Sequence, residues 1–581
     1  MKGNCVAIVK APTGFGKTVT VLYSISKMLR RGVFERVMYT VRTRNELDPV
    51  IKECKSLDLD FVVVYSIKRM CPLARDSNIS SEGFWSICAV LRLRGECRFY
   101  SGVSTVSSYD VVKIVKDSED HLSIAKNLAD RIGVCPYYTL IRFVNDVDVA
   151  ILTYPYIFKE SIWLATFRDY DASQTLLVID EAHNILNIGS IMGETISIKD
   201  LKKAIDESLD LSAEDVAERL KNILYISINN VSGKGYTYIG KEKLGVDTGF
   251  VDKVSNLVFT AIVKAMKNFE YKYNIAKLDI ALSRVSKFLS LLVNPNYDVY
   301  ASKNFYNQLV LSVLPTNFIP LEKIFEKFSA AILMSATPPS AEFLKNAIKI
   351  DKHVLQVDVE DFGAHNYLKE NSVTVIFTGA TTSYRSRNKA VFNIYKELIV
   401  RVYEVVPRGI ILVVYPSYDV MNTIAEELAI ENAIVESGHT PLDVLNFVIH
   451  KPKVLLNIVA GGRLAEGIEF VVNGKSLVES VIVVGIPYPQ PDDYVEKLRQ
   501  SIVKGGGSYV DYYRDIAAVR VLQAIGRAIR NENDYAFVIL ADRRYVNPEI
   551  LKRLGLRPRV ITNNISKIIQ VANNYFNQIG M

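Results

Sequence analysis

The chain has 581 residues, of which 49% are apolar and 23% are charged, and its formal net charge is +7. This composition excludes a disordered or small disulfide-rich protein, and the length allows three or four domains with large cores. The mild positive charge permits a polyanionic partner without requiring one. The longest uncharged run, Asn304 to Leu321, is broken by prolines and amides, which excludes a membrane span there. The chain opens on a strand rather than a signal peptide, and we expect a cytoplasmic protein.

The first predicted strand, Val6–Val9, leads into a glycine-bearing loop, and a helical pattern follows over Val19–Arg30. The backbone N–H groups of such a loop and the positive end of the helix dipole can cradle phosphates. A tight turn without a ligand would use the same glycines but would not need the Lys-Thr pair that follows them. We expect Lys17 to reach the outer phosphates and Thr18 to hold Mg²⁺. The predicted nucleotide-binding residues of this loop are Thr13, Gly14, Phe15, Gly16, Lys17 and Thr18.

Two further strands are predicted at Arg36–Thr40 and Phe61–Tyr65. Strands that alternate with helices in this way form a parallel sheet covered on both faces. Ligands of such sheets gather at the carboxyl ends of the strands, where the phosphate loop also lies.

Four of the six cysteines fall in the segment that interrupts this alternation: Cys71, Cys88, Cys97 and Cys135. Disulfides are not expected in a cytoplasmic protein, so clustered thiols suggest a metal site. Prolines follow the first and the last of them, as they often follow cluster-ligating cysteines. The wide spacings do not match the paired knuckles of zinc ribbons. From the residues alone, a metal site and a set of unrelated core cysteines both remain open.

The sheet resumes at Val149–Tyr156 and at Leu176–Asp180, and the second strand ends in Asp180-Glu-Ala-His183. A carboxylate at the end of a buried strand beside a phosphate loop suits water-mediated Mg²⁺ binding. We assign that role to Asp180 and expect Glu181 to orient or deprotonate the attacking water. His183 completes the predicted catalytic loop.

Residues 198–324 lose the strand alternation, and helical periodicity marks Asp200–Leu209, Ala213–Leu224 and Asp279–Leu292, with a loop expected at Gly233–Tyr238. We expect a mainly helical insertion, whose tyrosines and lysines suit nucleic-acid contact or core packing equally well. Ala330–Pro338 then returns to the first sheet, and its Ser335–Thr337 turn can sense a bound phosphate.

A second α/β domain follows, with strands expected at Val373–Phe377, Gly409–Tyr415, Val454–Val459, Val481–Ile486 and Ala536–Ala541 and helices at Asn388–Val406 and Val420–Leu428. Gln523, Arg527 and Arg530 recur at helical spacing, which predicts one shared helix face. Two arginines on a helix are usually solvated. Small residues between these three would let the face approach the first domain, as arginine fingers require.

These motifs occur in the order seen in superfamily 2 DEAH-type helicases, and the chain more closely resembles the archaeal XPD-type DNA helicases. The resemblance implies two RecA-like α/β motor domains with parallel sheets, and a 5′-to-3′ ATP-dependent DNA helicase that acts in DNA repair. It also implies nucleotide contacts from Glu466 and Gly467. The stretches that carry the resemblance are Val41–Glu46, Leu152–Tyr156, Val178–Asn184, Leu464–Glu469, Val484–Pro489 with Pro491–Tyr494, and Gln523–Arg530.

The resemblance also implies a domain organisation. Residues 1–67, 141–197 and 326–358 would form the first motor domain and 359–581 the second. Residues 68–140 would form an iron–sulfur domain, with Cys71, Cys88, Cys97 and Cys135 holding a 4Fe–4S cluster. Residues 198–325 would form an arch domain, with single-stranded DNA threading between the insertions and the first motor domain.

Six residues match positions that line the DNA strand in relatives: Arg42, Thr43, Arg44, Tyr154, Tyr384 and Arg387. We therefore expect single-stranded and forked DNA as partners, and a monomer. An RNA helicase, a non-enzymatic scaffold, and a shortened paralogue that hydrolyses ATP with weak or no unwinding are the alternatives.

Only five residues precede the first strand, whereas relatives carry a helix there with a glutamine that reads adenine. A site without hydrogen-bond partners for the base cannot reject other bases strongly. The expectation is therefore that the chain as given hydrolyses ATP and GTP with similar efficiency.

Overall fold

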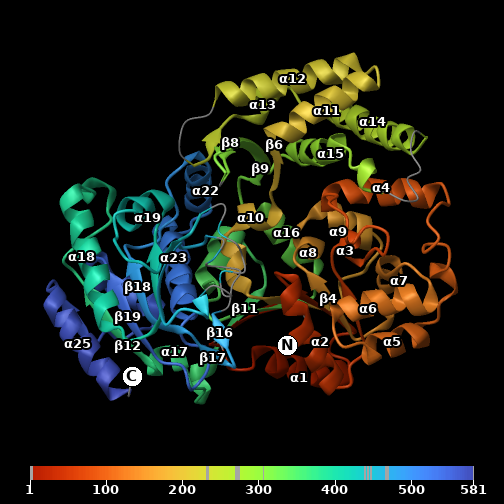
Figure 1. Ribbon diagram of the computed structural model, residues 1–581. Helices are drawn as coiled ribbons and strands as arrows, with labels where there is room; N and C mark the ends of the chain where they lie inside the picture. Colours follow the sequence, from red (N-terminus) through yellow and green to blue (C-terminus); the bar gives the residue numbers. More distant parts are fainter. Residues whose placement is uncertain are drawn as a thin grey trace.

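Two open parallel sheets form two lobes, and two insertions extend from the first lobe (Figure 1). The structure is a computed structural model that describes residues 4–12, 14–230, 235–267, 275–304, 306–437, 440, 444, 448–462, 464 and 470–579. In Figure 1 the second lobe is cyan to blue, the first insertion is orange, and the second insertion, yellow to green, lies at the top. The two parallel sheets confirm the predicted fold class.

The sheet of the first lobe has the order β11-β1-β10-β5-β2-β4-β3, and all neighbouring strands run parallel. Its central strands are buried on both faces, which explains their continuous apolar sequences. The carboxyl ends of β1, β10 and β5 lie side by side, so the three loops that follow them share one edge. The strands are β1 Cys5–Lys10, β2 Arg36–Val41, β3 Phe61–Val64, β4 Val149–Thr153, β5 Thr175–Asp180, β10 Ala330–Ser335 and β11 His353–Asp358.

Helices cover this sheet. The helix after the phosphate loop, α1 (Lys17–Arg30), buries Val21, Leu22 and Ile25 on one face and exposes Lys27 and Arg30 on the other. The other helices of this lobe are α2 Leu47–Ser56, α8 Pro155–Phe158, α9 Glu160–Phe167, α10 Ile188–Met192 and α16 Ile319–Lys327.

The first insertion lies between β3 and β4 and is helical throughout its regular elements. It contains α3 Ile67–Met70, α4 Ser81–Leu93, α5 Ser108–Asp117, α6 His121–Asn127 and α7 Pro136–Arg142. The serine before α4 caps that helix, since the Ser80 hydroxyl accepts from the Gly83 N–H at 2.9 Å.

The second insertion combines helices with a four-stranded antiparallel sheet of order β6-β9-β8-β7. Helices Ile198–Asp210, Glu214–Asn229 and Ala281–Leu292 agree with the predicted segments, but helices Lys241–Leu244 and Thr248–Lys267 and the sheet were not predicted. Its long strands are almost fully buried, so they lack the alternation that marks a half-exposed strand. The elements are α11 Ile198–Asp210, α12 Glu214–Asn229, α13 Lys241–Leu244, α14 Thr248–Lys267, α15 Ala281–Leu292, β6 Glu194–Ser197, β7 Thr237–Tyr238, β8 Tyr297–Lys303 and β9 Leu309–Pro315.

The second lobe is built on a parallel sheet of order β14-β15-β13-β18-β19-β12-β20. Alternate residues of β13 (Gly409–Tyr415) enter two separate cores, with Leu412 on one face and Val413 on the other. The other strands are β12 Ser372–Phe377, β14 Ala433–Val435, β15 Lys453–Val459, β18 Val478–Val484, β19 Ala536–Ala541 and β20 Val560–Thr562. The helices are α17 Tyr367–Glu370, α18 Lys389–Val405, α19 Tyr418–Ala425, α22 Asp493–Lys504, α23 Tyr509–Ile525, α24 Pro548–Leu554 and α25 Ile565–Gln578.

Helices α22 and α23 join the two lobes through apolar contact. Tyr494, Leu498, Tyr512 and Val519 belong to the same buried cluster as the core of the first lobe. The Tyr512 hydroxyl also donates to the Leu186 carbonyl at 2.7 Å. The first lobe therefore meets the second along a packed seam, with the loops at the carboxyl edges beside it.

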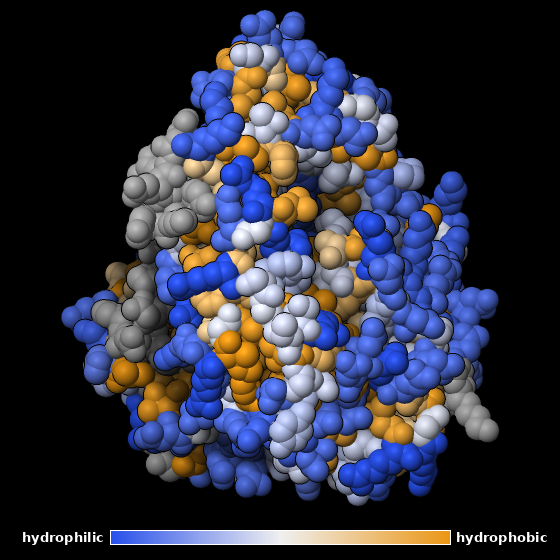
Figure 2. All heavy atoms as spheres, turned by 90° about the vertical axis from the view of Figure 1, so that its right-hand side faces the viewer, coloured by the Kyte–Doolittle hydropathy of each residue, from blue (hydrophilic) through white to orange (hydrophobic). Residues whose placement is uncertain are grey.

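Within the described residues, no helix is long and apolar enough to cross a membrane. On the face drawn in Figure 2, hydrophilic side chains separate the hydrophobic areas from one another.

Candidate functional site: a nucleotide cleft between the lobes

A cavity of about 1240 Å³ opens between the lobes and is lined by residues from both. The first lobe contributes the Asp180–His183 loop and the Ser335–Thr337 turn, which follow β5 and β10. The second lobe contributes Gln523, Arg527 and Arg530. The fold thus brings together predicted catalytic residues, such as His183 and Gln523, that are 340 positions apart in the sequence.

The phosphate loop has the backbone that its glycines predict. Gly14 and Gly16 have φ angles of 82° and 81°, in the left-handed region that favours glycine, and α1 begins at Lys17. A Cβ on Gly14 would lie 2.4 Å from the carbonyl oxygen of Arg530, so only glycine permits this approach of the second lobe. Thr13 lies outside the described residues.

Two hydrogen-bond donors hold the Asp180 carboxylate at the end of β5. The Tyr39 hydroxyl donates to its Oδ2 at 3.0 Å, and the Glu181 N–H donates to its Oδ1 at 2.8 Å. Tyr39 also hydrogen-bonds with the Thr18 side chain, which links the two predicted Mg²⁺ ligands. Burial and the neighbouring charge of Glu181 raise the pKa of Asp180 above its ordinary value. A bound cation would favour the ionised form, so a hydroxyl and a carboxylate in this place suit Mg²⁺.

Glu181 has a φ of 48°, a left-handed conformation that costs a non-glycine residue roughly 1–3 kcal/mol. Two donors hold its carbonyl in this conformation: the Tyr154 hydroxyl at 3.1 Å and the Asn184 amide at 2.8 Å. The side chain lies 3.7 Å from Lys17 Nζ. Burial alone would raise the pKa of Glu181, but the hydrogen bond from His183 and the charge of Lys17 outweigh it and lower that pKa. Glu181 is therefore a carboxylate, as a residue that orients water must be.

His183 connects its own loop to the Ser335–Thr337 turn of the same lobe and to Gln523 of the second lobe. Its Nδ1 lies 3.2 Å from Glu181 Oε2 and 2.9 Å from the Ser335 hydroxyl, and its Nε2 lies 2.7 Å from Gln523 Nε2. An amide nitrogen only donates, so the imidazole accepts at Nε2 and carries its proton on Nδ1. The Ser335 hydroxyl in turn accepts the Thr337 N–H at 3.2 Å.

The three second-lobe residues do not share a continuous helix face, which differs from the prediction. Helix α23 ends at Ile525, and Gly526 stands at its C-terminus. Arg527 and Arg530 follow in a turn, yet both still line the cavity with Gln523. The helical spacing therefore groups three residues that line one cavity, although α23 ends before Arg527.

The predicted DNA-contacting residues fall into three groups. Arg42 and Thr43 line the cleft near Asp180, and Arg44 is exposed beside them. Tyr384 is 86% exposed, and the Arg387 guanidinium lies 5.9 Å from its ring centre. Tyr154 is only 4% exposed, and its hydroxyl donates to the Asp180 carbonyl at 2.5 Å. In this conformation Tyr154 supports the catalytic loop and offers no surface to a strand, which differs from the expectation.

Known proteins resemble this chain in sequence and in fold. The DEAD_2 family model matches residues 39–201, and the Helicase C-terminal domain model matches residues 399–556. ATP-dependent DNA helicase XPD of Sulfolobus acidocaldarius is 27% identical over 94% of this chain and 93% of its own length. A solved XPD helicase structure superposes with a TM-score of 0.75 and 25% identity over 96% of each chain. The chain belongs to the XPD-type superfamily 2 helicases. ATP-dependent DNA helicase CHL1 of Kluyveromyces lactis is also 27% identical, over 86% of this chain and 68% of its own length.

Two of the positions that the XPD-type motifs predict cannot be placed. Glu466 and Gly467 lie outside the described residues, as does most of the Leu464–Glu469 motif. Sequence reasoning in turn missed Tyr39 and Asn184, which hold the catalytic loop. A tyrosine inside an apolar strand looks like a core residue, so no signal in the sequence marks Tyr39.

The four cysteines of the first insertion approach one another in this XPD-type helicase. Cys71, Cys88 and Cys135 are buried, and Cys97 is partly exposed. Burial, aided by the charges of the neighbouring cysteines, raises the pKa of each buried thiol, to about 11 for Cys88, where Arg92 opposes the rise, and to about 12 for Cys135. Among the residues that the structure describes, no group of three or more His, Cys, Asp or Glu side chains is placed to hold a single metal ion.

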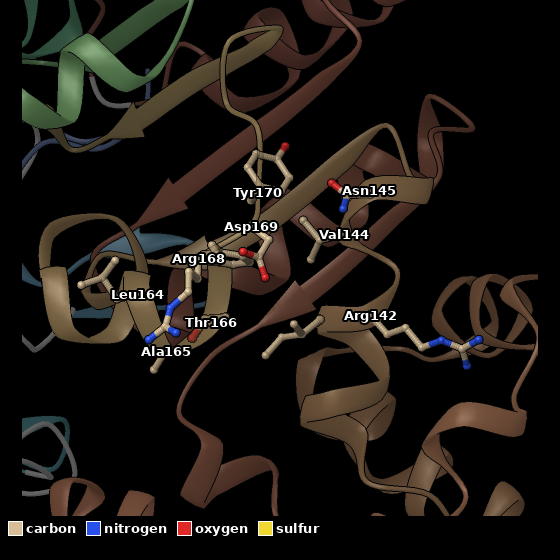
Figure 3. A pocket seen from close by; sticks show the side chains of 11 residues that line it. Arg142, Val144, Asn145, Leu164, Ala165, Thr166, Arg168, Asp169 and Tyr170 are labelled. Atoms are coloured by element: carbon tan, nitrogen blue, oxygen red, sulfur yellow. The ribbon is translucent and has the colours of Figure 1, made fainter.

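A second, polar cavity of about 470 Å³ lies away from these motifs. Its walls are two facing segments, residues 141–145 and 164–170, and the Arg142 side chain points away from the other labelled side chains (Figure 3). None of the predicted site residues lines it.

Proposed function

We propose that this chain is an ATP-dependent DNA helicase that moves 5′ to 3′ along single-stranded DNA, unwinds forked duplexes and acts in DNA repair as an archaeal XPD-type enzyme. The observation that carries the proposal is the single cleft in which Asp180, Glu181 and His183 of one lobe face Gln523 and Arg527 of the other. A two-lobed cleft of this kind can close on ATP and reopen after hydrolysis, which converts chemistry into movement.

In the proposed hydrolysis step, Lys17 and the N–H groups of the phosphate loop bind the β- and γ-phosphates. Thr18 and Asp180 would hold Mg²⁺, which neutralises phosphate charge when bound. Glu181 orients a water molecule toward the γ-phosphate and accepts its proton. Arg527 and Arg530 approach the developing charge from the second lobe, so catalysis requires the closed arrangement of the lobes.

The proposed DNA contacts lie on both lobes. Arg42, Thr43 and Arg44 on the first lobe can bind phosphates, and the exposed Tyr384 with Arg387 on the second lobe can stack on a base. Contacts to phosphates and base faces tolerate any sequence, as a translocating enzyme must. The two lobes would hold the DNA strand in turn as they close and reopen. The strand would then advance by one step in each cycle of ATP hydrolysis.

We further propose that the four cysteines hold a 4Fe–4S cluster. In such a cluster each thiolate binds a different iron, so the four sulfurs surround a group larger than a single ion. The four thiols are close enough to shift one another's pKa values. Within the described residues, no three of them are placed to hold one metal ion, which fits a larger group. Backbone N–H groups of Leu73, Tyr137 and Tyr138 also hydrogen-bond to the Cys71 and Cys135 sulfurs, which would stabilise thiolates.

The proposed domain organisation has residues 68–140 as the iron–sulfur domain and 198–325 as the arch, with 1–67, 141–197 and 326–358 in the first motor domain and 359–581 in the second. Arg284 supports a fixed contact between the two insertions. Its guanidinium donates to Asp200 at 2.9 Å, to Asp279 at 2.8 Å and to the Ser80 hydroxyl at 3.3 Å. A closed passage between these insertions and the first lobe would admit a single strand and exclude a duplex.

Strand displacement on forked DNA tests the proposal. Matched substrates carry either a 5′ or a 3′ single-stranded tail, and the Glu181→Gln variant serves as the inactive control. We expect ATP-dependent unwinding from the 5′ tail alone. Unwinding only from the 3′ tail would reject the polarity. DNA-stimulated ATP hydrolysis without unwinding would instead favour the alternative, a DNA-binding ATPase that acts as a scaffold.

A further inference from the structure

The segment that joins the lobes lies beside the phosphate loop. β11 pairs in parallel with β1, with Asp358 opposite Lys10, so the residues after both strands leave the sheet at the same edge. Lys10 Nζ lies 2.7 Å from Asp358 and 3.9 Å from Glu360. Lys10, Glu360 and Asn366 line the cavity that also holds the catalytic residues. The joining segment, residues 359–370, is therefore a wall of the cleft on the side of β1 opposite to Asp180.

The amide of Asn366 has a fixed orientation in this wall. Its Nδ2 donates to Glu360 Oε1 at 2.7 Å, and a carboxylate can only accept, so the nitrogen must face Glu360. Glu360 is itself held by Lys369, whose Nζ lies 2.6 Å and 2.8 Å from its two oxygens. The backbone N–H of Asn366 donates to Glu370 at 3.0 Å.

The other side-chain atom of Asn366, Oδ1, is buried and has no hydrogen-bond partner within the described part of the chain. A buried acceptor without a donor is costly, so it marks a place where a ligand can supply the donor. Because Glu360 can only accept, the amide of Asn366 cannot rotate by 180° to exchange Oδ1 and Nδ2. The wall therefore presents an acceptor and not a donor.

We infer that Asn366 reads the base of the nucleotide and selects the 6-amino group of adenine over the 6-oxo group of guanine and hypoxanthine. The inference rests on the proposed function, which puts the phosphates at Lys17, and it takes the base to lie toward the joining segment, on the side of β1 away from Asp180. The 6-amino group of adenine can donate to Oδ1. The 6-oxo group of guanine or hypoxanthine is itself an acceptor and cannot. Base choice then needs no segment ahead of β1, which differs from the expectation of equal ATP and GTP use.

Competition binding tests the inference without requiring unwinding. ATP and ITP, which differ in the 6-substituent of the base and in the proton that hypoxanthine carries on N1, each displace a ribose-labelled fluorescent ATP analogue in the presence of Mg²⁺. We expect ATP to bind roughly ten-fold to a hundred-fold more tightly than ITP, since ITP leaves Oδ1 unpaired. Asn366→Ala should bring this ratio close to one, mainly by weakening ATP. His365→Ala is the matched control, because His365 is exposed and does not line the cavity, and it should retain the ratio.

A second variant reverses the proposed orientation. In Glu360→Gln, Lys369 would hold the new amide oxygen, and the new amide nitrogen would donate to Asn366 Oδ1. Asn366 would then present Nδ2 to the base, so the preference should move from ATP toward ITP. Equal binding of ATP and ITP by the wild type, or an unchanged ratio in Asn366→Ala, would overturn the inference while leaving ATP hydrolysis intact. Binding of neither nucleotide would overturn the proposed motor function together with it.

Discussion

The His183 Nε2 atom accepts a hydrogen bond from the side chain of Gln523 at 2.7 Å, and this contact joins the catalytic loop of one lobe to the other. Nδ1 on the opposite side of the ring faces Glu181 at 3.2 Å. A movement that withdraws Gln523 therefore changes the surroundings of the catalytic carboxylate through a single imidazole. The position of Gln523 in the cleft is therefore coupled to the position of Glu181 through His183.

Gln523→Ala should weaken this link. We expect DNA-stimulated ATP hydrolysis to fall roughly ten-fold to a hundred-fold, because a small misplacement of catalytic groups is enough for such a loss. Nucleotide binding should change little, since the phosphate loop is untouched. Steady-state kinetics with and without single-stranded DNA measures both quantities. Gln500→Ala on the exposed face of α22 is the control, and equal kinetics in the two variants would contradict the role of Gln523.

The proposed hydrolysis step depends on Lys17 and Glu181. Glu181→Gln keeps the shape but removes the base, so turnover should fall by about 10²–10⁴ while ATP binding remains. Lys17→Ala removes the cation at the phosphates and should abolish hydrolysis together with most of the affinity for ATP. Circular dichroism would establish that both variants are folded. Normal turnover in either one would reject the motor assignment.

The cysteine cluster predicts a colour and a metal content. Protein purified without oxygen should be brown, with thiolate-to-iron absorption and about four irons per chain. Cys88→Ser should lose the cluster and strand separation while keeping some ATP hydrolysis, because the cluster site is remote from the phosphate loop. Cys54→Ser is the control, since Cys54 is buried in α2 outside the insertion. Stoichiometric zinc without iron would reject the cluster.

The parallel sheets were predictable because their strands are continuous apolar runs that end in chemically distinctive loops. Asp180 illustrates this, since a carboxylate after five buried residues can be assigned from the sequence. The phosphate loop is similar, because Gly14 and Gly16 occupy backbone conformations that favour glycine.

What could not be predicted depends on contacts between distant segments. Gly526 is a signal for the end of α23, but the helical spacing of Gln523, Arg527 and Arg530 was followed instead. The hydrogen bond of Tyr39 to Asp180 spans 141 positions, and that of Asn366 to Glu360 matters only because β11 lies beside β1. The strands β8 and β9 were missed because burial on both faces removes the alternation that identifies a strand.

The junction between the second insertion and the second lobe gives a structural prediction. Asp492 accepts the Tyr236 N–H at 3.0 Å and the Val495 N–H at 2.9 Å, so it holds the insertion and also caps α22. Asp492→Ala should destabilise α22 by about 1 kcal/mol, the usual effect of losing a helix cap, and should loosen the insertion as well. Faster limited proteolysis between residues 230 and 248 would reveal this. Asp361→Ala, an exposed site elsewhere, should leave the cleavage rate unchanged.

A buried carboxylate in the second lobe predicts how stability depends on pH. Glu479 in β18 is only 7% exposed and lies close to Gly409 of the neighbouring strand. Burial raises the pKa of Glu479 to about 7, although Lys475 and Arg408 oppose the shift and Asp534 adds to it. The folded chain therefore binds a proton that the unfolded chain releases between pH 4.5 and about 7. Stability from this group is present at low pH and is lost as the pH rises through that window.

Glu479→Gln should remove this loss, because a neutral amide has no charge to bury. At pH 8 the variant should exceed the wild type in free energy of unfolding by about 3 kcal/mol, the equivalent of the shift in pKa from 4.5 to about 7. Well below pH 4.5 the difference should nearly vanish, since Glu479 is then protonated in the folded and in the unfolded chain. Thermal unfolding midpoints at pH 5 and pH 8 measure the effect, with Glu397→Gln on the exposed face of α18 as the control. A gap of the same size at both pH values would show that packing, and not the charge of Glu479, determines the change.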